Sequence, residues 1–189
     1  MGRSSAPRPP HATARFTLAR SGHAGVVDEL TQGHSSAANA ADERRRGGSV
    51  SDPFDLERFV RAQDGGTYDQ ALRELRDGAK RGHWMWFVFP QVAGLGRSPT
   101  AQRYAVSGLE EAHSYLAHPV LGARLIECAQ ALLASGDRDP VRVFGPVDAV
   151  KLRSSMTLFE AAAPDERVFA EVLERYFDGE RDEATTSRL

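Results

Sequence analysis

The segment from His83 to Gln91 constrains the fold of this chain more than any other stretch. It reads His-Trp-Met-Trp-Phe-Val-Phe-Pro-Gln, it is the densest apolar run in the sequence, and it contains both tryptophans, Trp84 and Trp86. If the run is extended, successive side chains point to opposite faces, and both faces are apolar. Such a segment must be covered on two sides and therefore belongs in the core. Apolar periodicity alone leaves a short buried helix as the alternative, and Pro90 ends either structure.

Most of the remaining sequence within residues 51–189 has the apolar spacing of amphipathic helices. The clearest case is a helix expected over residues 148–162. Its apolar stripe consists of Ala149, Leu152, Met156, Phe159 and Ala163. Capping patterns mark further helix starts at Ser51 or Asp52 before Pro53, at Thr67 with Gln70, and at Ser98-Pro99. The predicted fold class is mainly α: a single compact multihelical domain with one short extended aromatic segment.

Residues 1–50 differ in composition from the remainder. They are rich in Ser, Ala, Gly, Arg and Pro and hold few large apolar residues, so we expect a disordered N-terminal tail. Arg44 to Arg46 are more typical of a solvated tail than of a nucleic-acid site. The alternative is a mis-assigned N-terminal extension. Two lysines against twenty-two arginines suggest a GC-rich coding sequence, in which Val50 would be a GTG start.

Composition and charge argue against several classes of protein. The net charge of −2 argues against nucleic-acid binding. No apolar run has the length of a membrane span or of a signal-peptide core, so we expect a cytoplasmic protein. Cys128 is the single cysteine, which excludes an internal disulfide and a cysteine zinc cluster and predicts a buried thiol. His113 and His118 lack the spacing of a helical metal site, so neither a metal nor a cofactor is expected. The sequence leaves a protein partner unknown.

Six motifs distinguish the chain from about Asp52 to its C-terminus. They are Asp-Pro-Phe-Asp-Leu-Glu-Arg-Phe at 52–59, His-Trp-Met-Trp-Phe with Phe-Pro-Gln at 83–91, Gly-Leu-Gly-Arg-Ser at 94–98, Tyr-Ala at 104–105, Tyr-Leu-Ala-His-Pro-Val-Leu-Gly at 115–122, and Lys-Leu-Arg-Ser-Ser-Met-Thr-Leu-Phe at 151–159. With these motifs the chain resembles a bacterial family, domain of unknown function 1810, whose members are frequently labelled calpastatin. The resemblance implies a compact multihelical domain and carries no established activity.

A looser resemblance links the chain to N-glycosidases of the NADAR type, which are associated with ADP-ribose and riboflavin-intermediate chemistry. The shared order of features is Phe89-Pro90, Gly94, Tyr104, Glu110 or Glu111, Arg153 with Met156, and Phe177. This resemblance implies a nucleotide-like or ADP-ribose-like ligand and cleavage of an N-glycosidic bond.

Glycosidic cleavage needs a carboxylate beside the sugar to activate water. The catalytic candidates are Glu110, Glu111 and Asp148, with His83 as a general base or a structural hydrogen-bond donor. Phosphate groups could be held by Arg97, Lys151 and Arg153, with hydroxyl donors from Ser154 and Ser155. Further ligand contacts are expected from Trp84 or Trp86, Gln91, Gly94, Gly96 and Tyr104. The structural alternatives are core burial for the tryptophans, a tight turn for the glycines, an exposed helix face for Glu110 and Glu111, and a polar helix face for Lys151 to Ser155.

Two functional hypotheses follow. In the first, the aromatic run and the Lys-Leu-Arg-Ser-Ser helix meet and enclose a polar pocket, which recognises a nucleotide-like or ADP-ribose-like molecule and could cleave its N-glycosidic bond. In the second, the chain is a helical protein–protein interaction module without catalysis, and residues 84–89 form an exposed docking surface. The hypotheses differ in whether the candidate residues converge on one concave site.

Overall fold

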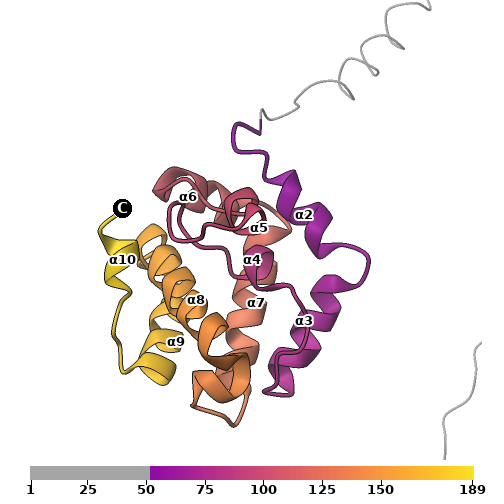
Figure 1. Ribbon diagram of the computed structural model, residues 1–189, viewed down its shortest axis with the longest axis vertical. Coiled ribbons are helices and arrows are strands. Elements are labelled where there is room, and N and C mark those ends of the chain that lie inside the picture. Colours follow the sequence, from indigo (N-terminus) through magenta and orange to yellow (C-terminus); the bar gives the residue numbers. More distant parts are fainter. Residues whose placement is uncertain (1–51) are drawn as a thin grey trace, which may run out of the picture. The chain divides into compact units, whose positions relative to one another are not determined.

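The computed structural model describes residues 52–189, which form nine helices within that range (Figure 1). They are α2 (Glu57–Gln63), α3 (Thr67–Arg76), α4 (Met85–Val88), α5 (Pro99–Arg103), α6 (Leu109–Ala117), α7 (Leu121–Ala134), α8 (Pro140–Ala162), α9 (Arg167–Phe177) and α10 (Glu183–Thr186). The mainly α fold class is therefore confirmed. The tail predicted for residues 1–50 and the alternative cap Ser51 lie outside the described residues. Between residues 52 and 189, every helix is too short or too polar to cross a membrane.

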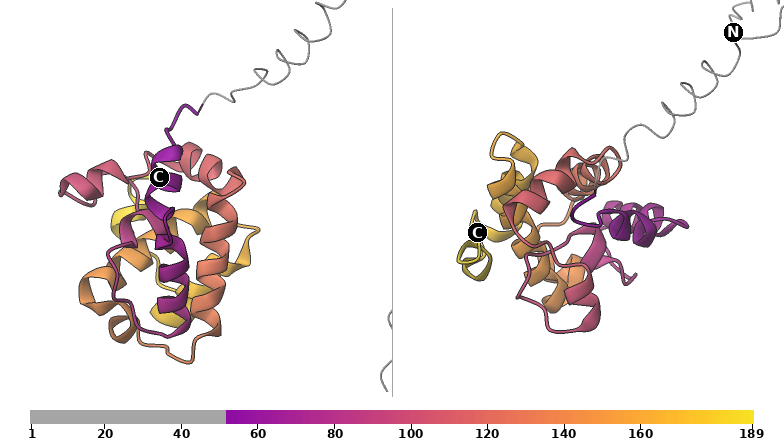
Figure 2. Two further views of the ribbon diagram at one scale, coloured as in Figure 1. Left: turned by 90° about the vertical axis from the view of Figure 1, so that its right-hand side faces the viewer. Right: turned by 90° about the horizontal axis from the view of Figure 1, so that it is seen from above.

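Helices α7 and α8 form the centre of the packing. Helix α8 packs against α6, α9 and α10, and α7 packs against α3, α6 and α9. Figure 1 shows α2 and α3 on one side of these two helices and α9 and α10 on the other, while Figure 2 shows α3 alongside α7. The predicted apolar stripe faces this core: Ala149, Leu152, Met156 and Phe159 are buried. Ala163 ends the stripe as the partly buried C-cap of α8.

The aromatic segment is helical rather than extended, which corrects the expectation from sequence. It forms the single turn α4, and the amides of Phe87 and Val88 donate to the carbonyl of Trp84. Burial follows the helical period, with Trp84, Met85, Val88 and Phe89 buried and Trp86 and Phe87 partly exposed. Residues 52–189 contain no strand with which an extended run could pair, so a local turn satisfies the backbone groups instead.

Glycines interrupt two of the helical stretches. Gly145 in α8 has φ +76° and ψ +165°, so the helix kinks there, between Phe144 and Pro146. Between α5 and α6 the chain is non-helical from Tyr104 to Gly108. Tyr104 and Glu111 therefore lie on either side of a full break and do not share one helix face.

The predicted helix caps have mixed outcomes. Ser98 caps α5, because its hydroxyl accepts the amide of Ala101 (3.1 Å), and Pro99 is the first helical residue. The capping box of Thr67 and Gln70 is wrong. Helix α3 follows the left-handed Gly66 without a side-chain cap, and Gln70 donates to Glu74 (2.8 Å).

The start predicted at Pro53 is also too early. Helix α2 begins at Glu57, whose amide donates to Asp52 (3.2 Å).

A closed loop carries α5 to the edge of the core. The amide of Ala93 donates to the carbonyl of Val106 (2.8 Å), and the amide of Val106 donates to the carbonyl of Gln91 (2.9 Å). These bonds form an isolated parallel bridge between Val92 and Val106, and both valines are buried. Because both ends of the loop are held in the core, the intervening residues have a defined position.

Candidate functional site

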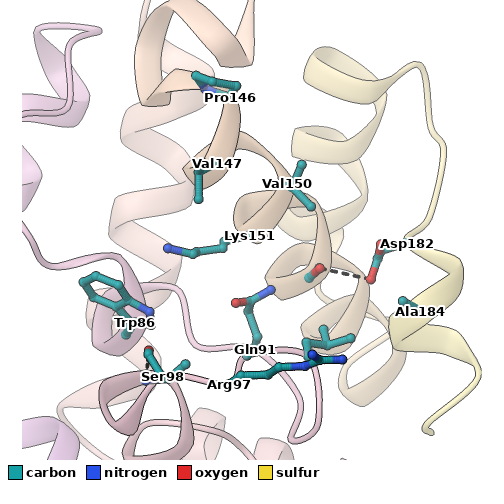
Figure 3. Close-up of a pocket in the computed structure, with 14 residues that line it drawn as sticks. Trp86, Gln91, Arg97, Ser98, Pro146, Val147, Val150, Lys151, Asp182 and Ala184 are labelled. Carbon is teal, nitrogen blue, oxygen red and sulfur yellow. Dashed lines mark hydrogen bonds between the residues drawn. The ribbon is translucent and has the colours of Figure 1, made fainter.

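A pocket of about 660 Å³ opens between α4, the loop with α5, the second half of α8, and α10 (Figure 3). The aromatic run contributes Trp86, the Lys-Leu-Arg-Ser-Ser helix contributes Lys151 and Ser154, and the loop contributes Gln91 and Arg97. The two segments that were expected to meet do meet, but the hollow between them is not simply polar, because Leu95, Val147 and Val150 line it together with polar and cationic side chains.

Trp86 and Lys151 contact each other across this pocket. The Lys151 Nζ atom lies 4.3 Å from the Trp86 ring centroid, which is a cation–π geometry. In Figure 3, Lys151 extends from α8 toward Trp86. Trp86 is partly exposed because the helical turn of α4 directs Met85 and Val88 into the core and leaves Trp86 on the opposite face. The helical turn of α4 thus leaves Trp86 accessible to a ligand, whereas Trp84 is buried in the core.

Lys151 belongs to a row of three charged side chains, Lys80, Asp148 and Lys151, which we call the charged row. Asp148 Oδ1 lies 2.8 Å from Lys151 Nζ, and Asp148 Oδ2 lies 2.6 Å from Lys80 Nζ. Lys80 also donates to the carbonyl of Gly82 (2.7 Å) and lies 5.0 Å from the Trp84 ring centroid. The chain has no other lysines. Each lysine therefore contacts one tryptophan, and both share one carboxylate.

The two lysines determine the protonation state of Asp148. Burial would raise the pKa of this carboxyl, but hydrogen bonds from Lys151 and Lys80 hold the pKa below its usual value. Both carboxylate oxygens are engaged, so Asp148 is a counter-ion and a poor general base. The sequence predicted a catalytic role for Asp148, but both of its carboxylate oxygens already bond to lysines.

The loop wall of the pocket presents Arg97. This residue is exposed, lines the pocket and forms no ion pair within residues 52–189. Gly96 also lines the pocket, and a Cβ atom there would approach Ala101 Cβ to 2.3 Å. Gly96 therefore permits close packing of the loop on α5. Gly94 has φ +90° and does not line the pocket, which fits the tight-turn alternative.

The opposite end of the pocket is held by Asp182, the N-cap of α10. Ser154 Oγ donates to Asp182 Oδ2 (3.0 Å), which also accepts the amide (2.9 Å) and hydroxyl (2.6 Å) of Thr185. These bonds fasten α10 to α8, so the hydroxyl proton of Ser154 is engaged in holding the fold. Ser155 is fully buried, its hydroxyl has no hydrogen-bond partner, and it does not line the pocket.

Other residues predicted for the site also lie away from this pocket. They are His83, Trp84, Tyr104, Glu111 and Arg153, together with Asp148. Glu111 is buried and accepts hydrogen bonds from Arg58 (2.6 Å) and from the amide of Ser107 (2.8 Å). It therefore holds the backbone around α6. His83 is exposed, and Tyr104 packs against Phe59 and Phe87.

Arg153 lies one helix face away, in a second hollow of about 570 Å³. It pairs there with Glu180 (3.3 Å), whereas Lys151 and Ser154 face the first pocket. The Lys-Leu-Arg-Ser-Ser sequence thus divides its polar side chains between two surfaces.

Eight of the fourteen residues that line the pocket were not among the predicted site residues, and three of these eight add exposed apolar surface or a carboxylate to the site. Val147 and Val150 line the pocket, and with Lys151 and Ser154 they follow helical spacing on one face of α8. That spacing was a usable signal. Asp182 is the third, and nothing near it in the sequence connects it with α8.

Comparison with known proteins supports the family but attaches no ligand to the pocket. The sequence model of one family matches residues 53–189, and its description is Protein of unknown function (DUF1810). The conserved hypothetical protein Rv1873 from Mycobacterium tuberculosis, whose crystal structure was determined at 1.38 Å, is similar to this chain, with 51% identity and a TM-score of 0.71. The match covers 73% of this chain and 98% of that protein's chain. Among curated proteins, none matches.

Proposed function

The chain belongs to the DUF1810 family of proteins of unknown function, and we propose that it binds a nucleotide-like anionic small molecule in the pocket of Trp86, Lys151 and Arg97. One observation carries the proposal: two cationic side chains and a partly exposed tryptophan line the same hollow. An indole offers a surface for a planar ring, and guanidinium and ammonium groups bind phosphate. ADP-ribose-like molecules belong to the same ligand class, and a cytoplasmic location is part of the proposal.

The remaining lining supports a ligand with an apolar part. Val147 and Val150 are 68% and 60% exposed, and Figure 3 shows both on α8 beside Lys151. Small-molecule sites typically combine apolar walls with a few placed polar groups. A planar base or nicotinamide ring could cover these valines while its anionic group approaches the cations.

Binding is better supported than cleavage of an N-glycosidic bond. Cleavage needs a carboxylate beside the sugar that can activate water. Glu111 is paired with Arg58, Asp148 is held between two lysines, and neither lines the pocket. Asp182 is the acidic residue in the lining, and its Oδ2 atom accepts three hydrogen bonds from Ser154 and Thr185. The proposal therefore concerns recognition.

The alternative of an interaction module has less support from the described residues. Its docking surface was expected at residues 84–89, but four of these six side chains are buried. Trp86 and Phe87 are the partly exposed pair, and Trp86 faces the pocket. The aromatic run is mainly part of the core, which leaves little apolar surface there for a protein partner.

Thermal unfolding with AMP, ADP-ribose, adenosine and ribose 5-phosphate tests the proposal. A ligand present at about one hundred times its Kd stabilises the folded state by about 2.7 kcal/mol, which raises Tm by several degrees. Trp86→Ala should remove most of this shift, because it deletes the aromatic wall. No shift with any of the four compounds would contradict the proposal.

A matched pair of charge variants distinguishes the pocket from general electrostatics. Arg97→Gln removes a cation that lines the pocket, whereas Arg76→Gln removes an exposed cation that pairs with Glu127 elsewhere on the surface. Both variants change the net charge by one unit. Only Arg97→Gln should weaken ligand binding, and equal weakening by both would point to a diffuse charge effect.

A further inference from the structure

The charged row holds more positive than negative charge close to the pocket. Lys80, Asp148 and Lys151 have side chains that are 8%, 18% and 18% exposed. Within residues 52–189, Asp148 is the one carboxylate within ion-pair distance of either lysine. Charged groups that are largely removed from water are normally paired. One positive charge in the row therefore lacks a counter-charge among the residues that the structure describes.

Lys80 is positioned so that it can influence a ligand in the pocket only through Asp148. Its ammonium group donates to the carbonyl of Gly82 (2.7 Å) and lies over the Trp84 ring, and its backbone amide donates to the carbonyl of Val143 (2.8 Å). It does not line the pocket, whereas Lys151 does. Lys80 thus neutralises part of the charge of Asp148 through one carboxylate oxygen. Lys151 then presents the excess positive charge of the row to a ligand.

We propose that Lys80 is a specificity-determining residue that makes the pocket select ligands with an anionic group, a phosphate or a carboxylate, bound at Lys151. This inference rests on the proposed function and assigns the preference for an anionic ligand to Lys80. Without Lys80, Asp148 and Lys151 would form a neutral pair, and the row would attract an anion far less. With Lys80, Asp148 positions Lys151 beside Trp86 without cancelling the charge of the row.

The use of lysine in this row fits the proposed role. Arginine fills twenty-two of the twenty-four basic positions of the chain, and both exceptions lie here. An ammonium group is compact and carries three donors, so Lys151 can bond to Asp148 and still offer a donor to a ligand. Lys80 likewise bonds to Asp148 and to the carbonyl of Gly82 at the same time.

Two variants with opposite expected effects test this inference. Isothermal titration with AMP and adenosine compares an anionic probe with a neutral one of the same ring and sugar. Lys80→Met should weaken AMP binding about tenfold, the size expected for loss of a nearby unit charge, and leave adenosine binding unchanged. Asp148→Asn should tighten AMP binding, because it removes the counter-charge and keeps a hydrogen-bonding side chain. Lys80→Arg should retain AMP binding.

Each outcome has a distinct meaning. If Lys80→Met weakens AMP and adenosine equally, or changes neither, the inference is wrong while nucleotide binding stands. If Asp148→Asn weakens AMP as Lys80→Met does, the charged row has only a structural role. Should the wild-type protein bind none of AMP, adenosine, ADP-ribose and ribose 5-phosphate, the proposed function itself fails. If Lys80→Met does not fold, Asp148→Asn and the wild-type salt dependence decide, because added NaCl should weaken AMP binding and spare adenosine.

Discussion

Trp84 donates its indole N–H to Glu74 across 2.8 Å, and both side chains are almost completely buried. The same Glu74 oxygen accepts the backbone amides of Arg81 (2.7 Å) and Gly82 (2.8 Å). One carboxylate therefore fixes the chain between α3 and α4, which includes Lys80. The buried tryptophan of the aromatic run thus helps to position the charged row, although it does not line the pocket.

This arrangement predicts an acid-sensitive contribution to stability. Burial would raise the pKa of Glu74, but hydrogen bonds from Gly82, Arg81, Gln70 and Trp84 lower the pKa to about 2 from 4.5. A group whose pKa is lower in the folded state stabilises that state above its unfolded pKa, and the contribution disappears as the pH falls through the folded pKa. We expect a loss of roughly 3 kcal/mol between about pH 4.5 and pH 2 from this group.

Urea unfolding of the wild type and of Glu74→Gln between pH 2 and pH 7 measures this contribution. The difference in free energy of unfolding between them should be largest near neutral pH and shrink below pH 4.5. A difference that does not change with pH would contradict the assignment.

The buried pair of Arg58 and Glu111 predicts a structural phenotype for a residue that had been a catalytic candidate. Their side chains are 11% and 4% exposed, and Arg58 also donates to the carbonyls of Arg103 (2.9 Å) and Ala105 (2.8 Å). Glu111→Ala leaves a buried guanidinium without its counter-charge, which typically costs about 3–5 kcal/mol. Denaturant unfolding should show this loss, while AMP affinity stays unchanged at temperatures where the variant is folded. A large fall in affinity with normal stability would return Glu111 to the site.

The fold was more predictable from sequence than the site. Apolar spacing located the α8 stripe because burial on one helix face imposes a period that the sequence must carry, and Ser98-Pro99 located α5 for an equally local reason. The extended conformation expected for the aromatic run was wrong, because a short apolar segment fits either a strand or a turn of helix. That choice depended on pairing partners elsewhere in the chain, which a local pattern does not contain.

The sequence indicated which types of residue could form a site, but tertiary contacts decide which surface each side chain faces. Lys151 and Arg153 are two positions apart, and the helical turn sends one to the pocket and the other to Glu180. Glu111 was predicted as a catalytic carboxylate, but in the folded chain it lies in the first turn of α6 and pairs with Arg58. The local sequence contains no signal for this distant contact. Asp182 reaches Ser154 from the C-terminal end, a contact with no local signal.

The kink in α8 provides a backbone prediction with a matched control. Gly145 has φ +76° and ψ +165°, a region that residues with a Cβ atom rarely adopt. Gly145→Ala should lower the free energy of unfolding by about 1–3 kcal/mol through backbone strain. Gly136→Ala is the control, because a Cβ atom would meet nothing within 4 Å at either position. Of these two glycines, Gly145 is the one with positive φ. Equal effects in thermal denaturation would show that strain at the kink is not the cause.

Packing at Gly96 connects the loop wall to ligand binding. A Cβ atom at this position would lie 2.3 Å from Ala101 Cβ, so Gly96→Ala must displace the loop from α5. Arg97 follows directly in the chain and lines the pocket, so we expect AMP affinity to fall about tenfold through misplacement of this cation. The double variant with Ala101→Gly removes the methyl group that the new side chain meets, and it should recover most of the affinity despite a helix cost of about 1 kcal/mol. Titration calorimetry on the three proteins would measure the recovery, and affinity that stays low in the double variant would contradict a steric origin.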